Sequence, residues 1–303
     1  MMTGVYSVLA TPFRQGRDVD VDGLRRIVDH FVATGVTGLT ALGVTSEAAR
    51  LTERERALVL DTVMTQVAGR VPVVVGTSAE GVLTCVAWSQ AAQAAGAAAV
   101  MVSPPRAPKL NSASVRAHYA ALADAVTLPI VVQDYPPVSG FTMEPALLAQ
   151  LARDIPTART IKLEDPPTPF KTTRILEATG EVPVAIFGGL GGVYLLEELL
   201  AGSAGAMTGF AFPEILVGIV GKWQAGDRDG AADLFYRTVP LMRVEFQEGI
   251  GMAIRKEVLR RRGLITDAST RAPGATLDAG TRAALDRVIA WTAAQEGLAW
   301  ISD

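Results

Sequence analysis

The sequence predicts a closed (β/α)₈ barrel, a TIM barrel, followed by a C-terminal helical extension. Short runs rich in Val, Ile, Leu and Ala alternate with longer amphipathic runs, and the short runs recur about every 30 residues. These short runs lack polar alternation, which indicates strands buried on both faces and therefore a parallel sheet covered by helices. Eight such units precede residue 215, the number that a closed barrel of this kind requires.

A doubly wound open sheet is the alternative to the barrel. That fold binds dinucleotides through a glycine-rich turn directly after its first strand. Here the first strand runs into Ala10-Thr11-Pro12-Phe13 instead. We therefore favour the barrel.

The individual elements follow from local patterns. Strands are expected at residues 5–10, 38–42, 71–76, 98–102, 129–133, 160–163, 183–187 and 205–208. Helices are expected between them at 21–34, 53–67, 82–95, 114–125, 145–152, 170–178 and 193–200. Thr52 and Glu55 form a capping box before the second helix, and glycines such as Gly35 and Gly96 fall where helices should end.

After Pro213 the pattern becomes wholly helical, with helices expected at 215–224, 230–247, 251–262 and 281–294. No linker separates this tail from the preceding units. We predict a barrel over residues 1–224 and a helical extension over residues 225–303 that packs on it.

The composition fits a folded soluble protein. The 303 residues carry a net charge of −3, with 49% hydrophobic and 19% charged residues. Dispersed, balanced charges give no indication of a nucleic-acid partner. The one basic cluster, Arg255-Lys256 to Arg260-Arg261-Arg262, is expected to form a solvated helix face or a subunit contact.

Few residues are available for disulfide, metal or serine-hydrolase chemistry. Cys85 is the only cysteine, so no intramolecular disulfide can form and a reducing compartment is expected. The only histidines, His30 and His118, lie in helical patterns away from acid clusters with metal-ligand spacing. The chain shows no signal peptide and no apolar run long enough to cross a membrane. We expect a cytoplasmic protein that does not bind membranes.

Lys162 is the main catalytic candidate. It lies at the end of a buried strand, in Ile161-Lys162-Leu163-Glu164, and chemistry in such barrels collects at the carboxyl ends of the strands. Burial favours the neutral amine, the form that attacks a carbonyl to make a Schiff base. Lowering its pKa from about 10.4 to about 7.5 requires roughly 4 kcal/mol. The alternative is a lysine that reaches solvent or pairs with Glu164.

Two glycine-containing strand ends are candidates for substrate binding. In Gly43-Val44-Thr45-Ser46-Glu47 a tight turn offers backbone N–H groups and hydroxyls for a small carboxylate, or is an ordinary capped turn. Gly188 and Gly189 allow close backbone approach to a ligand, or simply form a flexible turn.

Five short motifs occur in register along the chain: Thr11-Pro12, Gly43-x-Thr45-x-Glu47, Pro136 to Gly140, Ile161-Lys162 and Phe187-Gly188-Gly189. Together they resemble the dihydrodipicolinate synthase and N-acetylneuraminate lyase family. The resemblance implies a (β/α)₈ barrel that assembles as a homo-oligomer, a dimer or more usually a tetramer. It also implies no metal or organic cofactor, and a Schiff base between Lys162 and pyruvate or another 2-keto acid.

The chain departs from the family's proton relay. The family pattern places a hydroxyl residue where Val44 stands, a tyrosine where Gln133 stands, and an arginine where Val138 stands. The tyrosine that a neighbouring subunit normally borrows is replaced by the Pro105-Arg106 region. Glutamine donates hydrogen bonds but is not an acid or base near neutral pH.

Tyr135 is the first candidate to replace the relay, because it lies two residues after Gln133 and an extended chain sends both side chains to one face. Asp134, Glu47 and Glu164 are weaker candidates, and the two glutamates are expected mainly in structural ion pairs. Thr45, Ser46, Gln133, Gly188 and Gly189 are expected to bind substrate.

The sequence therefore predicts a Schiff-base lyase of a 2-keto acid, either an aldolase or a dehydratase of a 2-keto-3-deoxy sugar acid. One alternative is 4-hydroxy-tetrahydrodipicolinate synthase, which the absent arginine disfavours because that arginine clamps a carboxylate. A second alternative is a family member that binds keto acids without turnover.

Overall fold

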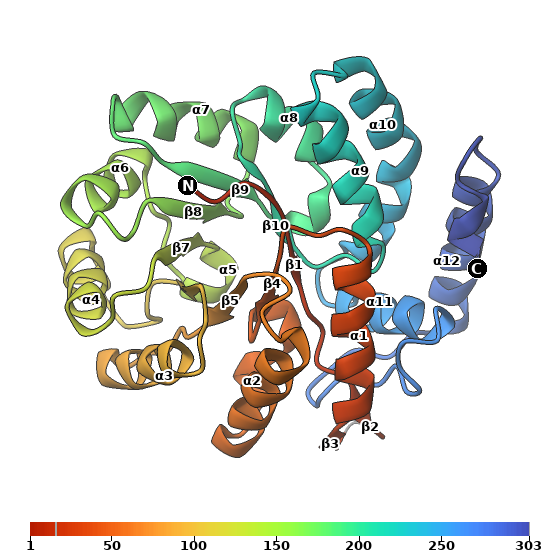
Figure 1. The fold of residues 1–303 in the computed structure, drawn as a ribbon, viewed down its shortest axis with the longest axis horizontal. Helices are drawn as coiled ribbons and strands as arrows, with labels where there is room; N and C mark the ends of the chain where they lie inside the picture. The colour runs from red at the N-terminus through yellow and green to blue at the C-terminus, as the bar shows by residue number, and fades with distance from the viewer. Residues whose placement is uncertain (16, 303) are drawn as a thin grey trace.

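The computed structural model describes residues 1–15 and 17–302, and its centre is a closed barrel (Figure 1). The barrel strands are β1 (Gly4–Val8), β4 (Gly38–Ala41), β5 (Val73–Gly76), β6 (Ala99–Val102), β7 (Ile130–Asp134), β8 (Thr160–Leu163), β9 (Ala185–Gly188) and β10 (Gly205–Thr208). All pair in parallel in the order β1-β10-β9-β8-β7-β6-β5-β4, and β4 closes on β1. The predicted (β/α)₈ barrel is confirmed.

Each barrel strand is followed by a helix on the outside of the barrel (Figure 1). These helices are α1 (Val21–Ala33), α2 (Glu53–Val67), α3 (Val82–Ala94), α4 (Ser112–Ala125), α6 (Pro145–Asp154), α7 (Thr168–Thr179), α8 (Leu195–Leu200) and α9 (Pro213–Gln224). The predicted capping box is present. Thr52 Oγ1 accepts a hydrogen bond from the Glu55 N–H, and the Thr52 N–H donates to Glu55 Oε2 at 2.8 Å.

Side chains alternate between two apolar layers along each strand. One layer fills the barrel interior and includes Tyr6, Met101, Val131, Phe187 and Met207. The other layer packs the strands against the surrounding helices. A one-residue difference in position at a strand end therefore decides whether a side chain enters the barrel mouth or the layer behind it.

The tail consists of α10 (Arg228–Glu245), α11 (Gly251–Arg261), α12 (Ala279–Ala293) and a last 3₁₀ turn, η4 (Ala299–Ser302). Helix α10 packs on α9, α11 and α12, and the tail lies to one side of the barrel (Figure 1). The division of the chain at residues 224 and 225 stays a prediction. Among the described residues no helix is both long and apolar enough to span a membrane.

Two local elements are absent from the sequence-based prediction. Strands β2 (Phe13–Arg14) and β3 (Asp18–Val19) form a small antiparallel hairpin after β1. Helix α5 (Pro136–Ser139) is a single turn after β7. Both are too short for any hydrophobic periodicity to be visible, so no pattern in the sequence indicates them.

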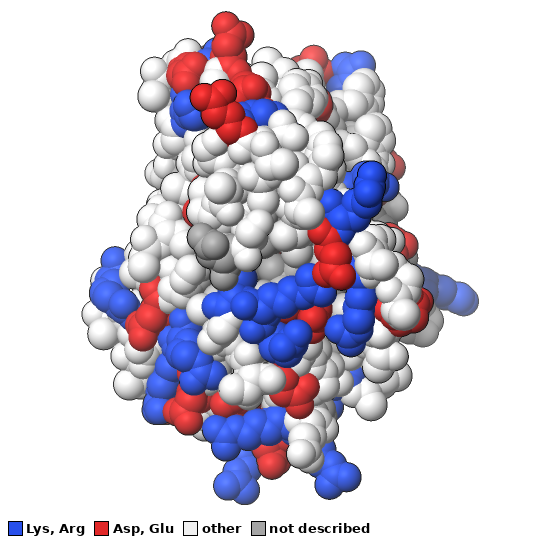
Figure 2. All heavy atoms as spheres, turned by 90° about the vertical axis from the view of Figure 1, so that its right-hand side faces the viewer, with Lys and Arg blue, Asp and Glu red and all other residues white. Residues whose placement is uncertain are grey.

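The basic cluster of α11 differs in part from the expectation. Arg260 and Arg261 are partly exposed and share the carboxylate of Glu257. Figure 2 shows the molecule from the side on which the tail lies, and basic and acidic side chains are interspersed on this face. Arg255 and Lys256 are instead buried, so the prediction of a solvated face is wrong for these two, because they lie on the side of α11 that faces the barrel mouth.

Candidate active site

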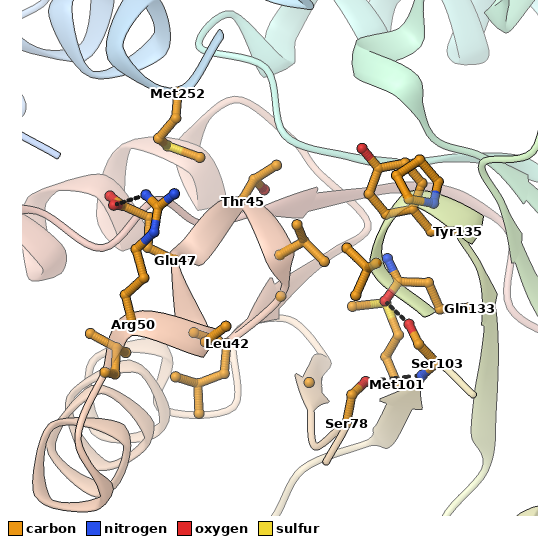
Figure 3. A pocket seen from close by; sticks show the side chains of 18 of the residues that line it. Leu42, Thr45, Glu47, Arg50, Ser78, Met101, Ser103, Gln133, Tyr135 and Met252 are labelled. Atoms are coloured by element: carbon orange, nitrogen blue, oxygen red, sulfur yellow. Dashed lines mark hydrogen bonds and ion pairs between the residues drawn. The ribbon is translucent and has the colours of Figure 1, made fainter. Parts of the chain in front are cut away.

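A cavity of about 700 Å³ opens at the carboxyl ends of the barrel strands. Its wall comes from the ends of β4 to β7 and from the α10–α11 connection. Figure 3 shows Gln133 and Tyr135 on one side of this cavity and Thr45 and Glu47 on the other. The cavity occupies the position at which barrels of this class carry their active sites.

Lys162 lies in the barrel interior, on the strand next to the one that carries Gln133. It is 3% exposed, and its partner in strand register is the cavity-lining Gln133. Its Nζ lies 3.1 Å from Glu164 Oε2, and the Gln133 amide donates to that same oxygen at 2.6 Å. The alternative predicted for Lys162, pairing with Glu164, is thus present in the structure. The pair brings the Glu164 carboxylate into contact with the Lys162 amine.

Gln133 is fixed by a chain of hydrogen bonds across neighbouring strands. The Ser103 hydroxyl donates to Gln133 Oε1 at 3.1 Å, and the Ser103 N–H donates to the Ser78 hydroxyl at 2.9 Å. Because its oxygen accepts from Ser103, the Gln133 amide nitrogen is directed at Glu164. Gln133 therefore orients the carboxylate but cannot carry a proton itself.

Gly189 and Gly188 face opposite sides of β9. A Cβ on Gly189 would lie 2.2 Å from Glu164 Cγ, so this glycine leaves room for Glu164 inside the barrel. A Cβ on Gly188 would lie 1.7 Å from Glu198 Oε2, on the helix side. Neither glycine lines the cavity. Both serve as close-packing positions in this structure, and their contact with substrate stays a prediction.

Thr45 and Ser46 lie in the 3₁₀ turn η1 (Val44–Ser46). The Ser46 N–H donates to the Gly43 carbonyl and its hydroxyl donates to the Leu9 carbonyl. Both donors of Ser46 are therefore engaged within the turn, and Ser46 does not line the cavity. Thr45 lines the cavity, and its hydroxyl has no hydrogen-bond partner in the described part of the chain.

Tyr135 shares the cavity wall with Gln133, as the two-residue spacing predicts. Burial raises the pKa of its phenol above the usual 10, and the nearby carboxylates of Glu164 and Glu248 raise it further. A phenol with a raised pKa stays protonated near neutral pH. Tyr135 is therefore suited to donate a proton rather than to accept one.

Asp134 lies on the opposite face from Gln133. Its carboxylate pairs with Lys171 of α7 at 2.6 Å, behind the strands, and burial raises its pKa to about 6. Because its side chain points away from the barrel interior, Asp134 does not line the cavity. The sequence-based suggestion of Asp134 as a proton carrier fails because the strand pleat turns its side chain away.

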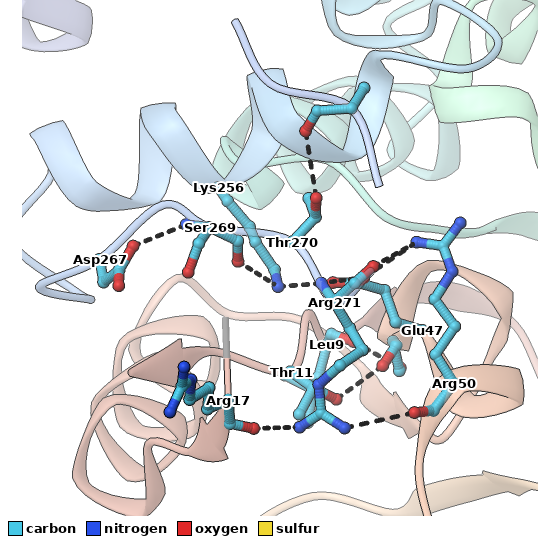
Figure 4. Close-up of polar contacts among 12 residues, drawn as sticks. Leu9, Thr11, Arg17, Glu47, Arg50, Lys256, Asp267, Ser269, Thr270 and Arg271 are labelled. Atoms are coloured by element: carbon cyan, nitrogen blue, oxygen red, sulfur yellow. Dashed lines mark hydrogen bonds and ion pairs between the residues drawn. The ribbon is translucent and has the colours of Figure 1, made fainter. Parts of the chain in front are cut away.

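Glu47 holds the tail against the barrel mouth (Figure 4). Its carboxylate contacts Lys256 Nζ at 2.5 Å and Arg50 Nη1 at 3.0 Å, and it accepts the Arg271 N–H at 2.8 Å. These contacts are the structural ion pairs expected for this residue. The described residues contain no cluster of three or more His, Cys, Asp or Glu that could hold a metal ion.

Comparison with known proteins matches this architecture. The model of the dihydrodipicolinate synthetase family matches residues 1–291. L-2-keto-3-deoxyarabonate dehydratase of Azospirillum brasilense is 34% identical over 285 residues, which cover 93% of this chain and 92% of that protein. A 4-hydroxy-tetrahydrodipicolinate synthase of Methanospirillum hungatei is 31% identical, covering 84% of this chain and 88% of that protein.

Among solved structures, dihydrodipicolinate synthase from Rhodopseudomonas palustris superposes with a TM-score of 0.90 at 33% identity, covering 96% of this chain and 97% of that one. The agreement spans the barrel and nearly all of the tail. The chain therefore belongs to the dihydrodipicolinate synthetase family, a family of lyases of the class I aldolase type that act on 2-keto acids.

Proposed function

We propose that the protein dehydrates a 2-keto-3-deoxy sugar acid through a Schiff base on Lys162. The observation that carries this proposal is the contact between Lys162 Nζ and the Glu164 carboxylate, with Gln133 fixed beside it. The similarity to a 2-keto-3-deoxyarabonate dehydratase supports the same reaction class.

The first step needs a neutral amine. Glu164 is in position to take the proton that the lysine must lose before Nζ attacks the C2 carbonyl. Attack gives a carbinolamine, whose hydroxyl leaves as water with the proton that Glu164 took, so that the protonated imine forms between Nζ and C2 and Glu164 is a carboxylate again. The imine acidifies the C3 protons because the electron pair left on C3 delocalises to nitrogen as an enamine.

The elimination step needs a base near C3 and an acid near the leaving hydroxyl. We assign the base to Glu164, which takes a C3 proton, and the acid to Tyr135, whose raised pKa keeps it protonated. The enamine electrons then form the C3–C4 double bond as the C4 hydroxyl leaves with the tyrosine proton as water. Hydrolysis releases the dehydrated keto acid and restores Lys162.

Aldol cleavage is less well supported by the same groups. It requires a base that takes the proton of the C4 hydroxyl, whereas Tyr135 on the cavity wall is poorly suited to be a base. The synthase reaction remains the second candidate, because the Methanospirillum hungatei synthase is 31% identical over most of both chains. Coupled turnover with pyruvate and aspartate semialdehyde tests it directly.

Borohydride trapping followed by peptide mass spectrometry tests the Schiff base. We expect pyruvate and borohydride to add a reduced adduct to Lys162 in the wild type, and no adduct in Lys162→Arg. Lys222→Arg is the matched control, since Lys222 is an exposed lysine on α9. Absence of an adduct on Lys162 with a panel of keto acids would overturn the proposal.

Product analysis separates the reaction types. With five- and six-carbon 2-keto-3-deoxy sugar acids, dehydration consumes substrate without releasing pyruvate, and lactate dehydrogenase reports any pyruvate formed. Released pyruvate would identify an aldolase instead. An adduct on Lys162 with no product from any substrate would identify a binding protein without turnover.

We further infer that the protein acts in the cytoplasm as a homodimer or homotetramer. Membership of the dihydrodipicolinate synthetase family supports this inference. Light scattering coupled to size-exclusion chromatography measures the assembly, and a mass equal to one 31.9 kDa chain would contradict it.

A further inference from the structure

Lys171 of α7 is a buried lysine that joins the two chain segments carrying the proposed acid and base. It is 7% exposed, and its Nζ lies 2.6 Å from Asp134 Oδ2 and 2.7 Å from Asp165 Oδ2. Asp134 directly precedes Tyr135, and Asp165 directly follows Glu164. One ammonium group therefore binds the chain neighbour of each proposed proton carrier.

Tyr135 and Glu164 both lie just past the ends of their strands. Strand β7 ends at Asp134 and β8 ends at Leu163, and these two residues form the last pair in register. A backbone hydrogen bond from the Glu164 N–H to the Asp134 carbonyl, at 2.8 Å, still links the two segments. From Tyr135 the chain turns into the single-turn helix α5. The pairing of the strands thus stops where the two proposed catalytic side chains begin.

The side chain of Lys171 supplies the missing link between these segments. A flexible stem that ends in three N–H donors lets one lysine bridge two carboxylates. Lys171 lies near the start of α7, and α7 packs on α6 and α8, so the ammonium is held by a fixed helix. Within residues 1–15 and 17–302, neither Asp134 nor Asp165 has a second cationic partner.

Attachment of α7 to the barrel accounts for only one of the two contacts. The pair of Lys171 with the fully buried Asp134 already joins α7 to β7. The contact with Asp165 instead fixes the residue that follows Glu164. Catalytic groups must be held within about 0.5 Å of their working positions, and a misplacement of about 1 Å costs roughly 10²-fold in rate. Support on both sides of the pair therefore bears on the rate.

We propose that Lys171 is a positioning residue for the elimination, which holds Glu164 and Tyr135 in place by binding the aspartate beside each of them. The proposal rests on the proposed function, because that function assigns the base to Glu164 and the acid to Tyr135. Lys171 does not line the cavity. It therefore acts through its two neighbours and not on the substrate.

Hydrogen exchange at the methyl group of pyruvate measures the base step without a sugar acid. In D₂O, Glu164 takes a methyl proton from the imine to give the enamine, exchanges it with solvent and returns a deuteron to C3, and NMR follows the loss of the methyl signal. Lys171→Met should slow this exchange about 10- to 100-fold, while the final yield of borohydride-trapped adduct on Lys162 stays the same. Lys222→Met, at the exposed lysine of α9, is the matched control.

Asp165→Ala is the second variant, because Lys171→Met leaves Asp134 buried without its partner and could fail to fold. The Asp165 side chain is 21% exposed, and its removal keeps the pair of Asp134 with Lys171. We expect exchange to slow by about 10-fold in Asp165→Ala. Asp165→Asn keeps an acceptor oxygen and should recover most of the rate. Asp154→Ala, at an exposed aspartate of α6, should exchange at the wild-type rate.

Two further measurements separate positioning from general damage. If Asp165 acts through Glu164, then Asp165→Ala should slow exchange little further in a Glu164→Gln background, since residues that act through one another are not additive. Crystal structures of the wild type and of Asp165→Ala should show Glu164 or Tyr135 displaced by more than about 0.5 Å.

Three results would overturn the inference: wild-type exchange in folded Asp165→Ala, the same loss of rate in the Glu164→Gln background as in the wild type, or unmoved Glu164 and Tyr135 side chains. The crystal structures need no substrate. A wild-type protein that forms no adduct with any keto acid would therefore overturn the proposed function, while the positions of the two side chains would still decide whether Lys171 holds them.

Discussion

Burial alone does not mark the reactive lysine of this protein, because Lys162, Lys171 and Lys256 are all buried. Lys171 lies behind the strands between Asp134 and Asp165, and Lys256 pairs with Glu47 beneath α11. Lys162 instead projects into the barrel beside a residue that lines the cavity. Position in the fold, rather than burial, therefore separates a candidate nucleophile from a structural cation.

Replacing Glu164 by glutamine separates imine formation from turnover. Glu164→Gln keeps the size and hydrogen-bonding reach of the side chain but removes its ability to take a proton. We expect turnover to fall by roughly 10²- to 10⁴-fold, the usual contribution of a general base, while borohydride still traps pyruvate on Lys162, more slowly. Turnover within threefold of wild type would show that Glu164 only pairs with the lysine.

Replacing Tyr135 by phenylalanine tests its role as an acid. Removal of the hydroxyl should lower the dehydration rate by about 10²-fold and leave trapping of pyruvate unchanged. Because the phenol pKa is raised above 10, ionisation of Tyr135 should add no loss of wild-type activity below pH 10. A pH–rate profile of the two proteins checks this, and an alkaline loss near pH 8 that vanishes in Tyr135→Phe would contradict the assignment.

At the scale of elements, α8 packs on β9 through a buried carboxyl group. Glu198 is 1% exposed, accepts the Thr168 hydroxyl at 2.6 Å and fills the space left by Gly188. Burial raises its pKa to about 8. Between about pH 4.5 and 8, Glu198 is therefore protonated in the folded protein but ionised in the unfolded chain, where its pKa is near 4.5.

This raised pKa makes stability fall as pH rises. The contribution of Glu198 is fully present below pH 4.5 and is lost as pH rises through 8. We predict that wild-type protein loses on the order of 3–5 kcal/mol of unfolding free energy through this group between pH 4.5 and 9. Urea unfolding of Glu198→Gln should lack this loss, whereas Glu177→Gln, at an exposed glutamate of α7, should keep it. Equal pH dependence in all three proteins would refute the prediction.

The elements and their faces could largely be predicted from local patterns. Eight apolar runs separated by amphipathic ones specify the barrel, and the two-residue period places Gln133 and Tyr135 on one face. The same period turns Asp134 away, which becomes evident only once the register of β7 is known. The use of the Ser46 donors could not be predicted, because it depends on where Leu9 of the neighbouring strand lies.

At the scale of the whole molecule, the residues that the sequence analysis missed are those brought to the site by long-range packing. Arg255 and Glu245 belong to the tail but line the same cavity as Thr45, and no spacing rule connects them with it. The one local signal is a basic pair, Arg255-Lys256, inside a helix whose neighbouring residues are largely buried. Such a signal becomes informative only when the partner carboxylates are known.

The tail is attached to the barrel mouth by the ion pair between Glu47 and Lys256. Both side chains are buried, so removing Lys256 leaves Glu47 with the partly exposed Arg50 as its charged partner. We predict that Lys256→Met lowers the unfolding free energy by about 3–5 kcal/mol, and that adding Glu47→Gln to it restores part of this loss. The coupling energy from the double-mutant cycle should be on the order of 1–3 kcal/mol.

The exposed pair of Lys222 and Asp227 provides the matched control. The corresponding cycle, with Lys222→Met and Asp227→Asn, should give less than about 1 kcal/mol, because solvent screens exposed pairs. Equal coupling energies in the two cycles would show that the Glu47–Lys256 pair does not hold α11 over the active site.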